Sequence, residues 1–395
     1  MRKIGFLWWY NRYSKLLVSV LTIQKEALER MGHKVEIFNI TTAMEDKDEL
    51  ELLNDCDLVF TSVLPLLLQM KLQFVDTKKY DRIKAPVFFQ IDGYGATTFN
   101  ELGCNPIFHG VTKKAALVTF LDMNVYEEFR KTRQPFEYDK IFFIPNGAED
   151  LLEKYTVNEY KLTDEPLIGT LLKENYYKKP WIFLEAVKHL YGKIPSFRVL
   201  FPVLNWRAFN IDYAKHLWNG HSFGAITKKG FVKGIPYVQL HDIPNTYFMS
   251  LLPYRKIPNF IGSCDIFCHY SHGDAFGKTL TEAFSMGKAP LTSDIIRVQG
   301  VSTSKIDVVR EQIGKPMREA YNAIEPLFFS GNGEHYIMAP RENPVEYAEK
   351  MVWIIEHPVE YAVMGAKART WSKQWITWEE KWKHIFELCE ERNIL

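Results

Sequence analysis

Short runs of apolar residues alternate along the chain with stretches in which apolar residues recur every three or four positions. The short runs predict buried strands, and the helical spacing predicts amphipathic helices. This alternation is typical of parallel α/β sheets. In the first part of the chain we expect a helix over residues 16–31 and strands at 4–9, 35–38, 58–62, 87–91, 116–120 and 141–144.

The same rhythm restarts after a polar stretch at 156–166, which predicts a linker. The chain has 395 residues, more than one hydrophobic core usually organises, so two α/β domains in tandem are expected. The second part predicts strands at 167–172, 198–203, 237–240, 266–270 and 289–292, helices at 181–191 and 277–286, and helical structure from about 344 to the end.

Composition narrows the class of protein only a little. Apolar residues make up 47% and charged residues 25%, which is ordinary for a globular protein. The net charge of +1 gives no overall positive potential that would favour nucleic-acid binding. The five cysteines form no disulfide framework, no signal peptide begins the chain, and no apolar run could span a bilayer. These features favour a cytoplasmic protein. Cys264, Cys268 and His269 lack a second ligand pair, so no metal site is predicted.

Four tryptophans near the end of the chain stand at helical spacing: Trp371, Trp375, Trp378 and Trp382. This spacing predicts four indoles on one face of one helix. Such a face usually packs on the protein core. The alternative is a peripheral membrane contact in which the indoles enter the headgroup region, although nearby glutamates disfavour an anionic surface.

The segment from residue 264 to residue 294 carries the most chemical information. A buried strand gives way to a polar loop, and Gly277 then opens a helix whose first turn contains Lys278, Thr279 and Leu280. The first N–H groups of a helix have no internal partners and lie at the positive end of its dipole. This arrangement predicts a diphosphate site, to which Lys278 and Thr279 could add donors.

Two carboxylates bracket this turn. Asp274 precedes it and Glu282 lies within the helix, and such acids suit the neutral hydroxyls of a sugar and a ribose better than phosphate. The alternative is that Asp274 caps the helix and Glu282 is a solvated helix residue.

This run resembles the donor-site signature of the retaining GT-B glycosyltransferases of family 4. That signature is an acid, a Phe-Gly pair, a second acid eight residues after the first, an Ala and a later Gly-x-Pro. Here these are Asp274, Phe276-Gly277, Glu282-Ala283 and Gly287–Pro290. The first acid is usually Glu, and one extra residue separates Gly287 from Pro290.

Weaker similarities to the family occur in the same order elsewhere in the chain. They include Gly32-His33-Lys34-Val35, Pro145-Asn146-Gly147, and a pattern from Gly331 through Pro340 to Trp378. Gly169, Lys178 and Lys179 fall where the family has a Gly-Arg and a Lys that meet the donor phosphates. Thr170 stands at the Arg position, and Lys173 could substitute for it.

The resemblance implies a GT-B fold, with two Rossmann-like doubly wound domains facing across a cleft. Residues 1–155 would bind the acceptor and 165–370 the donor, and about 372–395 would cross back as a helix to the first domain. It implies transfer from a UDP- or GDP-sugar to a glycan, lipid-linked or protein-linked acceptor, with retention, no metal and no cofactor. The implied donor-binding residues are Gly169, Lys173, Lys178, Lys179, Phe276, Gly277, Lys278, Thr279, Leu280 and Glu282.

The acceptor half departs from the family. An aromatic loop containing Asn11, Arg12 and Tyr13 replaces the usual Gly-Gly, and it could stack on an acceptor or simply pack. Asp92 stands where the family has a His, with His109 as the next candidate. Asp92 could stabilise developing positive charge or act as a base, or it could be a turn acid. With Asp274 and Glu282 it completes the predicted catalytic set.

Two other classes of function remain open at this point. The chain could be another GT-B enzyme, such as an inverting transferase or a sugar-nucleotide epimerase, or a non-catalytic sugar-binding protein of the same fold. A dinucleotide-dependent dehydrogenase is disfavoured because no G-x-G-x-x-G follows the first strand.

Overall fold

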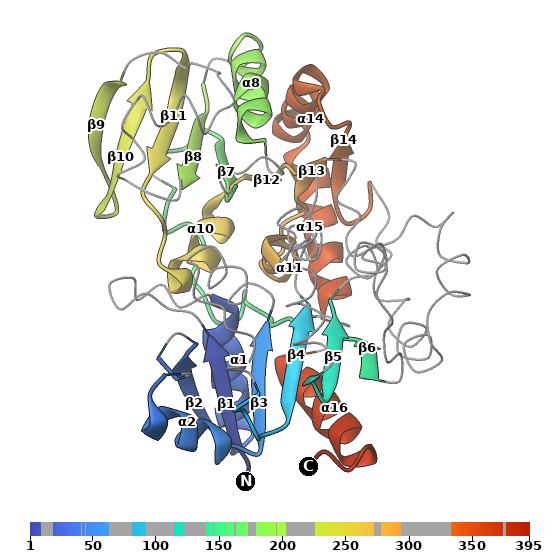
Figure 1. Ribbon diagram of the computed structural model, residues 1–395. Helices are drawn as coiled ribbons and strands as arrows, with labels where there is room; N and C mark the ends of the chain where they lie inside the picture. Colours follow the sequence, from blue (N-terminus) through green and yellow to red (C-terminus); the bar gives the residue numbers. More distant parts are fainter. Residues whose placement is uncertain are drawn as a thin grey trace. The chain divides into compact units, whose positions relative to one another are not determined.

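The computed structural model describes all residues except 9–18, 41, 44, 63–80, 92–113, 122–139, 145, 162, 173–178, 195, 203–225, 272–277, 294–332 and 374–376. The chain forms two compact units (Figure 1). Unit 1 contains Met1–Gly147 and Ile376–Leu395, and unit 2 contains Ala148–Val298 and Phe329–Trp375.

Unit 1 is built on a parallel sheet in the order β2-β1-β3-β4-β5-β6 (Figure 1). The order reverses between β1 and β3, as in doubly wound α/β folds, whose ligands bind outside the carboxyl ends of the strands near such a point. The strands are β1 (Lys3–Trp8), β2 (Lys34–Asn39), β3 (Leu58–Ser62), β4 (Val87–Ile91), β5 (Leu117–Phe120) and β6 (Ile141–Phe143). The described helices are α1 (Ser19–Arg30), α2 (Lys47–Asn54) and α16 (Trp378–Glu391).

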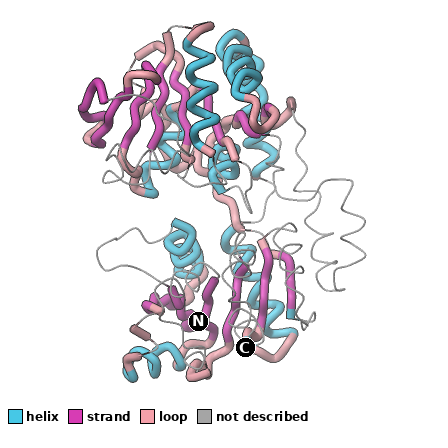
Figure 2. The backbone as a smooth tube through the Cα atoms, turned by 45° about the horizontal axis from the view of Figure 1, so that its top comes forward, coloured by secondary structure: helices cyan, strands magenta, loops and turns pink. Residues whose placement is uncertain are grey.

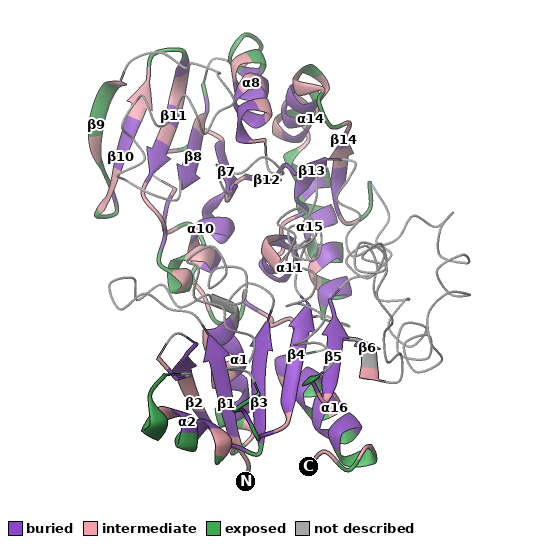
Figure 3. Cartoon of the chain, in the orientation of Figure 1, coloured by how far each residue is buried: buried purple, intermediate pink, exposed green. Residues whose placement is uncertain are grey.

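The last helix, α16, completes the core of unit 1. Trp382 is 0% exposed and lies 5.7 to 5.9 Å from the rings of Phe6, Phe60 and Phe88, which belong to three neighbouring strands. Figure 3 shows these strands as buried. The helix begins with a capping box between Thr377 and Glu380. The expectation that the last helix returns to the first domain is confirmed.

The tryptophan stripe does not lie on one helix, so that prediction is wrong. Helix α15 (Pro358–Ser372) ends before the capping box that starts α16. Trp371 therefore belongs to unit 2, whereas Trp378 and Trp382 belong to unit 1. All three indoles are buried, which leaves none of them to enter a membrane. Trp375 lies outside the described residues. Of the described helices, none is both long and apolar enough to cross a bilayer.

Unit 2 contains an eight-stranded sheet in the order β14-β13-β12-β7-β8-β11-β10-β9 (Figure 1). Six strands are parallel, and β9 and β10 form an antiparallel hairpin at one edge. The parallel strands are β7 (Leu167–Thr170), β8 (Arg198–Pro202), β11 (Ile243–Met249), β12 (Ile266–His269), β13 (Leu291–Ser293) and β14 (Ile337–Ala339).

The edge hairpin consists of β9 (Ile226–Val232) and β10 (Ile235–Leu240). Its two-residue turn, Lys233-Gly234, has positive φ angles of 50° and 77°. Such angles match the twist of paired strands in a tight hairpin. The strand expected at 237–240 is therefore present, but it runs antiparallel to both of its neighbours.

Helices cover both faces of the second sheet (Figure 2). One core cluster packs Phe183 and Tyr347 of the helices α8 (Pro180–Tyr191) and α14 (Pro344–Glu356) onto the strands. The opposite cluster contains Phe260 and Ala283, from α10 (Ile257–Ser263) and α11 (Lys278–Ser285). It also buries Tyr160, whose N–H donates to Ser263 Oγ at 2.9 Å. The stretch predicted as a linker is therefore part of unit 2, because Tyr160 belongs to its core.

Because Trp382 joins α16 to three strands, the Trp382→Ala substitution should destabilise unit 1 by about 3–5 kcal/mol, the usual cost of emptying a large core site. Hydrogen exchange of the β1, β3 and β4 amides measures this loss of stability in unit 1. Trp353→Ala is the control, because Trp353 is 36% exposed on α14. Equal exchange in the two variants would contradict the assignment of α16 to the core of unit 1.

Candidate functional site

Buried polar side chains mark the carboxyl ends of the central strands of unit 2. Thr170 ends β7, and His269 and Thr292 are paired in register at the ends of β12 and β13. Among the described residues, no group forms a hydrogen bond with the hydroxyls of Thr170 and Thr292. Elsewhere these strands are apolar, so the polar groups collect at the edge where ligands of parallel α/β sheets bind.

Helix α11 follows β12 at this edge and begins at Lys278, as the sequence predicts to within a residue. Leu280, like Ala283, is buried in the core side of the helix, and Thr279 is half-buried. The Thr281 hydroxyl donates to the carbonyl of Lys278 at 2.7 Å. Packing of the apolar face of α11 therefore fixes the position of the first turn of this helix.

Glu282 is buried on α11, with an exposed fraction of 6%. Lys278 Nζ lies 3.2 Å from Glu282 Oε1, one helical turn away, and forms an ion pair with it. The Lys278 ammonium also lies 4.3 Å from the ring centre of Tyr254. Among the described residues no other group donates to Glu282 Oε1, so a hydroxyl-bearing ligand could use the remaining acceptor capacity of this buried carboxylate.

The pKa of Glu282 is raised, primarily because burial disfavours the charged carboxylate. The Lys278 ammonium opposes this shift without cancelling it, and the negative charge of Glu149 adds to it. Glu149 lies near the start of unit 2. The site therefore holds a carboxylate that the fold does not fully stabilise.

Lys179 reaches the same edge from the start of α8. Its backbone is left-handed, with φ 31°, and its Nζ lies 2.5 Å from Glu342 Oε1. The N–H of Glu342 donates to the hydroxyl of Tyr270, the residue that follows β12, at 2.8 Å. These contacts hold a lysine cation beside the carboxyl end of β12.

Gly169 lies inside β7, at a position where close packing leaves no room for a side chain. A Cβ at this position would lie 2.1 Å from Cys264 Sγ and 3.0 Å from the ring of Phe260 on α10. A glycine is therefore needed for α10 to pack closely on the sheet.

The structure brings together Lys278, Thr279, Leu280 and Glu282 on one helix and places Lys179 at the same sheet edge. It also shows polar groups that sequence reasoning did not assign to the site, such as Thr292 and Glu342. A polar residue that ends an apolar run was the available signal for Thr292. The remaining predicted residues lie outside the described residues: Asn11, Arg12, Tyr13, Asp92, Lys173, Lys178, Asp274, Phe276 and Gly277.

Unit 1 has a comparable polar row at the carboxyl edge of its own sheet. Ser62, Gln90 and Thr119 are paired in register on β3, β4 and β5, and all three are buried. Beside them the ammonium of Lys381, 0% exposed on α16, donates to Gln90 Oε1 at 2.7 Å and to Asn146 Oδ1 at 3.1 Å. None of these residues was predicted as a site residue, although Asn146 lies in the Pro145-Asn146-Gly147 similarity, because they come from five separate segments.

One segment of unit 2 matches a known protein family. Residues 238–302 match the sequence model of the family described as glycosyl transferases, group 1. This segment includes β11, α10, β12, α11 and β13, and therefore both Lys278 and Glu282. No curated protein sequence matches the chain.

Solved structures similar to the whole chain are glycosyltransferases. HepE of Anabaena, in complex with UDP-glucose, has a TM-score of 0.67 at 15% identity, covering 99% of this chain and 100% of that one. Sucrose-phosphate synthase from Thermosynechococcus elongatus has 0.62 at 11% identity, covering 99% of each chain. A glycosyltransferase from Rickettsia africae has 0.59 at 13% identity, covering 99% of this chain and 98% of that one. The fold is therefore GT-B, with two Rossmann-like domains, as the sequence predicts.

The raised pKa of Glu282 leads to a pH-dependent stability. A carboxyl that binds its proton more tightly when folded makes the protein lose stability as the pH rises past the ordinary glutamate value of about 4.3. Glu282→Gln should therefore raise the melting temperature of unit 2 at pH 8, and the gain should shrink toward zero at pH 4.

Thermal unfolding of both proteins across pH 4 to 8 checks this, with Glu185→Gln as the control on α8, where the carboxylate is less buried and pairs with Lys188. A Glu282→Gln variant that is less stable than the wild type at pH 8 would contradict the raised pKa.

Proposed function

We propose that the protein is a glycosyltransferase that moves a sugar from a nucleoside-diphosphate sugar to a hydroxyl acceptor with retention of anomeric configuration. The observation that carries this proposal is the buried Glu282 carboxylate, one turn from the start of α11, whose Oε1 has only the Lys278 ammonium beside it among the described residues. A ribose hydroxyl supplies a further donor, and the helix start accommodates the diphosphate next to it.

Departure of the diphosphate requires positive charge at the helix start. The N–H groups of the first turn, the Lys278 ammonium and the Thr279 hydroxyl lie on α11, and Lys179 lies beside β12. Lys173 and Lys178 belong to the same proposed set. These groups stabilise a leaving diphosphate by preorganised electrostatics, so the proposed transfer needs neither a metal nor a cofactor.

The remaining proposed roles fall on residues known only from the sequence. Asp274 and the amides near Phe276-Gly277 bind the sugar, and Asp92 stabilises positive charge at the reacting carbon or acts as a base. Asn11, Arg12 and Tyr13 contact the acceptor, a glycan or a lipid-linked or protein-linked chain. Retention is supported by the resemblance to family 4 at Asp274 and Glu282.

A UDP-sugar is the first donor to test. The similar HepE structures contain UDP and UDP-glucose, and the segment that carries Glu282 matches the group 1 family. A GDP-sugar is the second candidate.

Glu282→Gln should lower the rate of transfer from UDP-glucose by about 10- to 100-fold, because a hydrogen bond to a charged group contributes about 1.5–3 kcal/mol. Glu185→Gln is the control for this rate measurement and should retain full activity.

A thermal-shift series with UDP, GDP and ADP identifies the nucleotide, because a ligand at 100 times its Kd stabilises the folded state by about 2.7 kcal/mol.

The same measurements separate the rival functions. NMR of the product anomer distinguishes retention from inversion, and a new nucleotide-sugar without transfer indicates an epimerase. Nucleotide stabilisation without turnover of any donor indicates a binding protein. If no nucleotide or nucleotide-sugar stabilises the protein or turns over, the proposed donor site is wrong.

A further inference from the structure

Unit 2 contains a cavity of about 370 Å³ at the amino-terminal edge of its sheet. Pro166 and Asp265, which immediately precede β7 and β12, lie on its wall. Glu282 follows the carboxyl end of β12, so the cavity lies at the opposite edge of the sheet from the proposed donor site. Its volume lies near the lower end of the range for small-molecule sites. We call it the amino-edge pocket.

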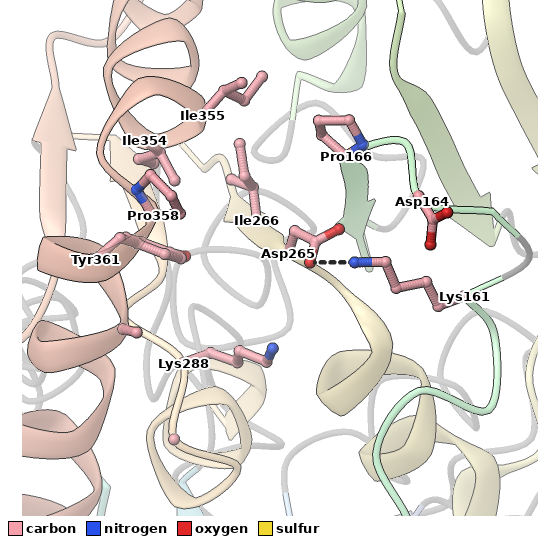
Figure 4. A pocket seen from close by; sticks show the side chains of 12 residues that line it. Lys161, Asp164, Pro166, Asp265, Ile266, Lys288, Ile354, Ile355, Pro358 and Tyr361 are labelled. Atoms are coloured by element: carbon pink, nitrogen blue, oxygen red, sulfur yellow. Dashed lines mark hydrogen bonds and ion pairs between the residues drawn. The ribbon is translucent and has the colours of Figure 1, made fainter.

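One side of the amino-edge pocket is apolar and the other is charged (Figure 4). Ile354, Ile355 and Pro358, from the end of α14 and the start of α15, form the apolar side. Lys161 and Asp164 face them from the loop before β7. A ligand that fits this space needs an apolar body and a polar group.

Two hydrogen-bond donors in the pocket remain available. Lys288 Nζ donates to the carbonyl of Cys264 at 2.6 Å, which uses one of its three N–H groups. The hydroxyl of Tyr361 is buried, the residue being 6% exposed, and its O–H donates to no group among the described residues. In Figure 4 both groups point toward the space beside Asp265. Together they could hold one acceptor group of a ligand.

The charges of the pocket favour a single negative charge on that ligand. Asp265 already has a cationic partner, because it accepts from Lys161 at 2.9 Å and from the N–H of Leu167 at 2.8 Å. Lys288 has no carboxylate partner among the described residues, and burial lowers its pKa, so its ammonium gains from a nearby anion. The start of α15, where His357 provides no side-chain cap, adds the positive end of a helix dipole.

Asp164 opposes a more highly charged ligand. It lies on the pocket wall and forms no ion pair with the described residues, so it would repel a second negative charge. A phosphate dianion is therefore disfavoured relative to a carboxylate.

We propose that the amino-edge pocket is a second ligand site, which binds a small organic monocarboxylate with an apolar body, its carboxylate held by Lys288 and Tyr361. The apolar body lies against Ile354, Ile355 and Pro358. This site does not depend on the transferase activity, because none of the residues that form it belongs to the proposed donor site.

Titration of the full chain with 4-fluorobenzoate, followed by ¹⁹F NMR, tests the proposal, with 4-fluorobenzamide as the neutral probe of the same shape. The carboxylate should bind with a Kd on the order of 1 mM, as expected for a ligand of this size, and the amide should bind about tenfold more weakly. Saturating UDP should leave the carboxylate bound, because the two sites lie at opposite sheet edges.

Three variants assign the contacts. Lys288→Met should weaken binding of the carboxylate about tenfold. Tyr361→Phe should weaken it about threefold without loss of stability, because the O–H donates to no described group in the unliganded protein. Asp164→Asn should strengthen it about twofold by removing a repulsive charge.

Lys193→Met is the matched control, since Lys193 pairs with Glu349 outside the pocket. Lys288→Met removes the donor to the Cys264 carbonyl, which is a reason for that variant to fail to fold. In that case Tyr361→Phe still tests the proposal. Equal binding of the amide, unchanged binding by Tyr361→Phe, or displacement by UDP would overturn the proposal.

Discussion

The central parallel strands of this protein's two sheets are buried on both faces, and this constraint decides where polar side chains can occur. A strand covered by helices on both sides must be apolar along its length, so its polar side chains collect where it ends. In unit 2 these are Thr170, His269 and Thr292, and in unit 1 they are Ser62, Gln90 and Thr119. Both sets lie at carboxyl ends, which is where parallel α/β folds bind their ligands. The fold therefore prepares a binding edge on each unit before any particular side chain is considered.

The two buried charges at these edges differ in how well the protein satisfies them. Lys381 donates to two amide oxygens, from Gln90 and Asn146, and so it ties α16 to the ends of β4 and β6. Glu282 has only the Lys278 ammonium beside its Oε1 among the described residues, and burial raises its pKa. Buried polar groups that the fold leaves unsatisfied reduce stability, and they commonly occur where a ligand completes them. This difference makes Lys381 a structural residue and Glu282 a ligand-binding candidate.

The sequence predicted each described strand of unit 1 to within one residue at either end, but it missed β11 in unit 2. The strands at 58–62 and 87–91 were predicted to the residue, because each is a short and mostly apolar run. Strand β9 was missed, because its sequence, ITKKGFV, is that of an exposed edge strand with little apolar signal. The tryptophan spacing concealed the break between α15 and α16, although Thr377 and Glu380 carry the signature of a capping box. Competing local signals of this kind are resolved only by packing.

The candidate site was predictable to a different extent. The helix start at Lys278 and the acid at Glu282 follow from a segment only a few residues long, and the structure places them on one helix. The polar row of unit 1 and the amino-edge pocket could not be predicted, since each depends on segments far apart in the chain. Lys288 and Tyr361, for example, meet only because α15 packs beside α11.

The central claim is that the start of α11 binds the diphosphate of a nucleotide donor. Hydrogen exchange with and without saturating UDP tests it most directly, because the first amides of a helix have no internal partner and exchange freely unless a ligand accepts from them. UDP should slow the exchange of the amides of Lys278, Thr279 and Leu280. Saturating UDP that slows exchange elsewhere and leaves these three amides unchanged would contradict it.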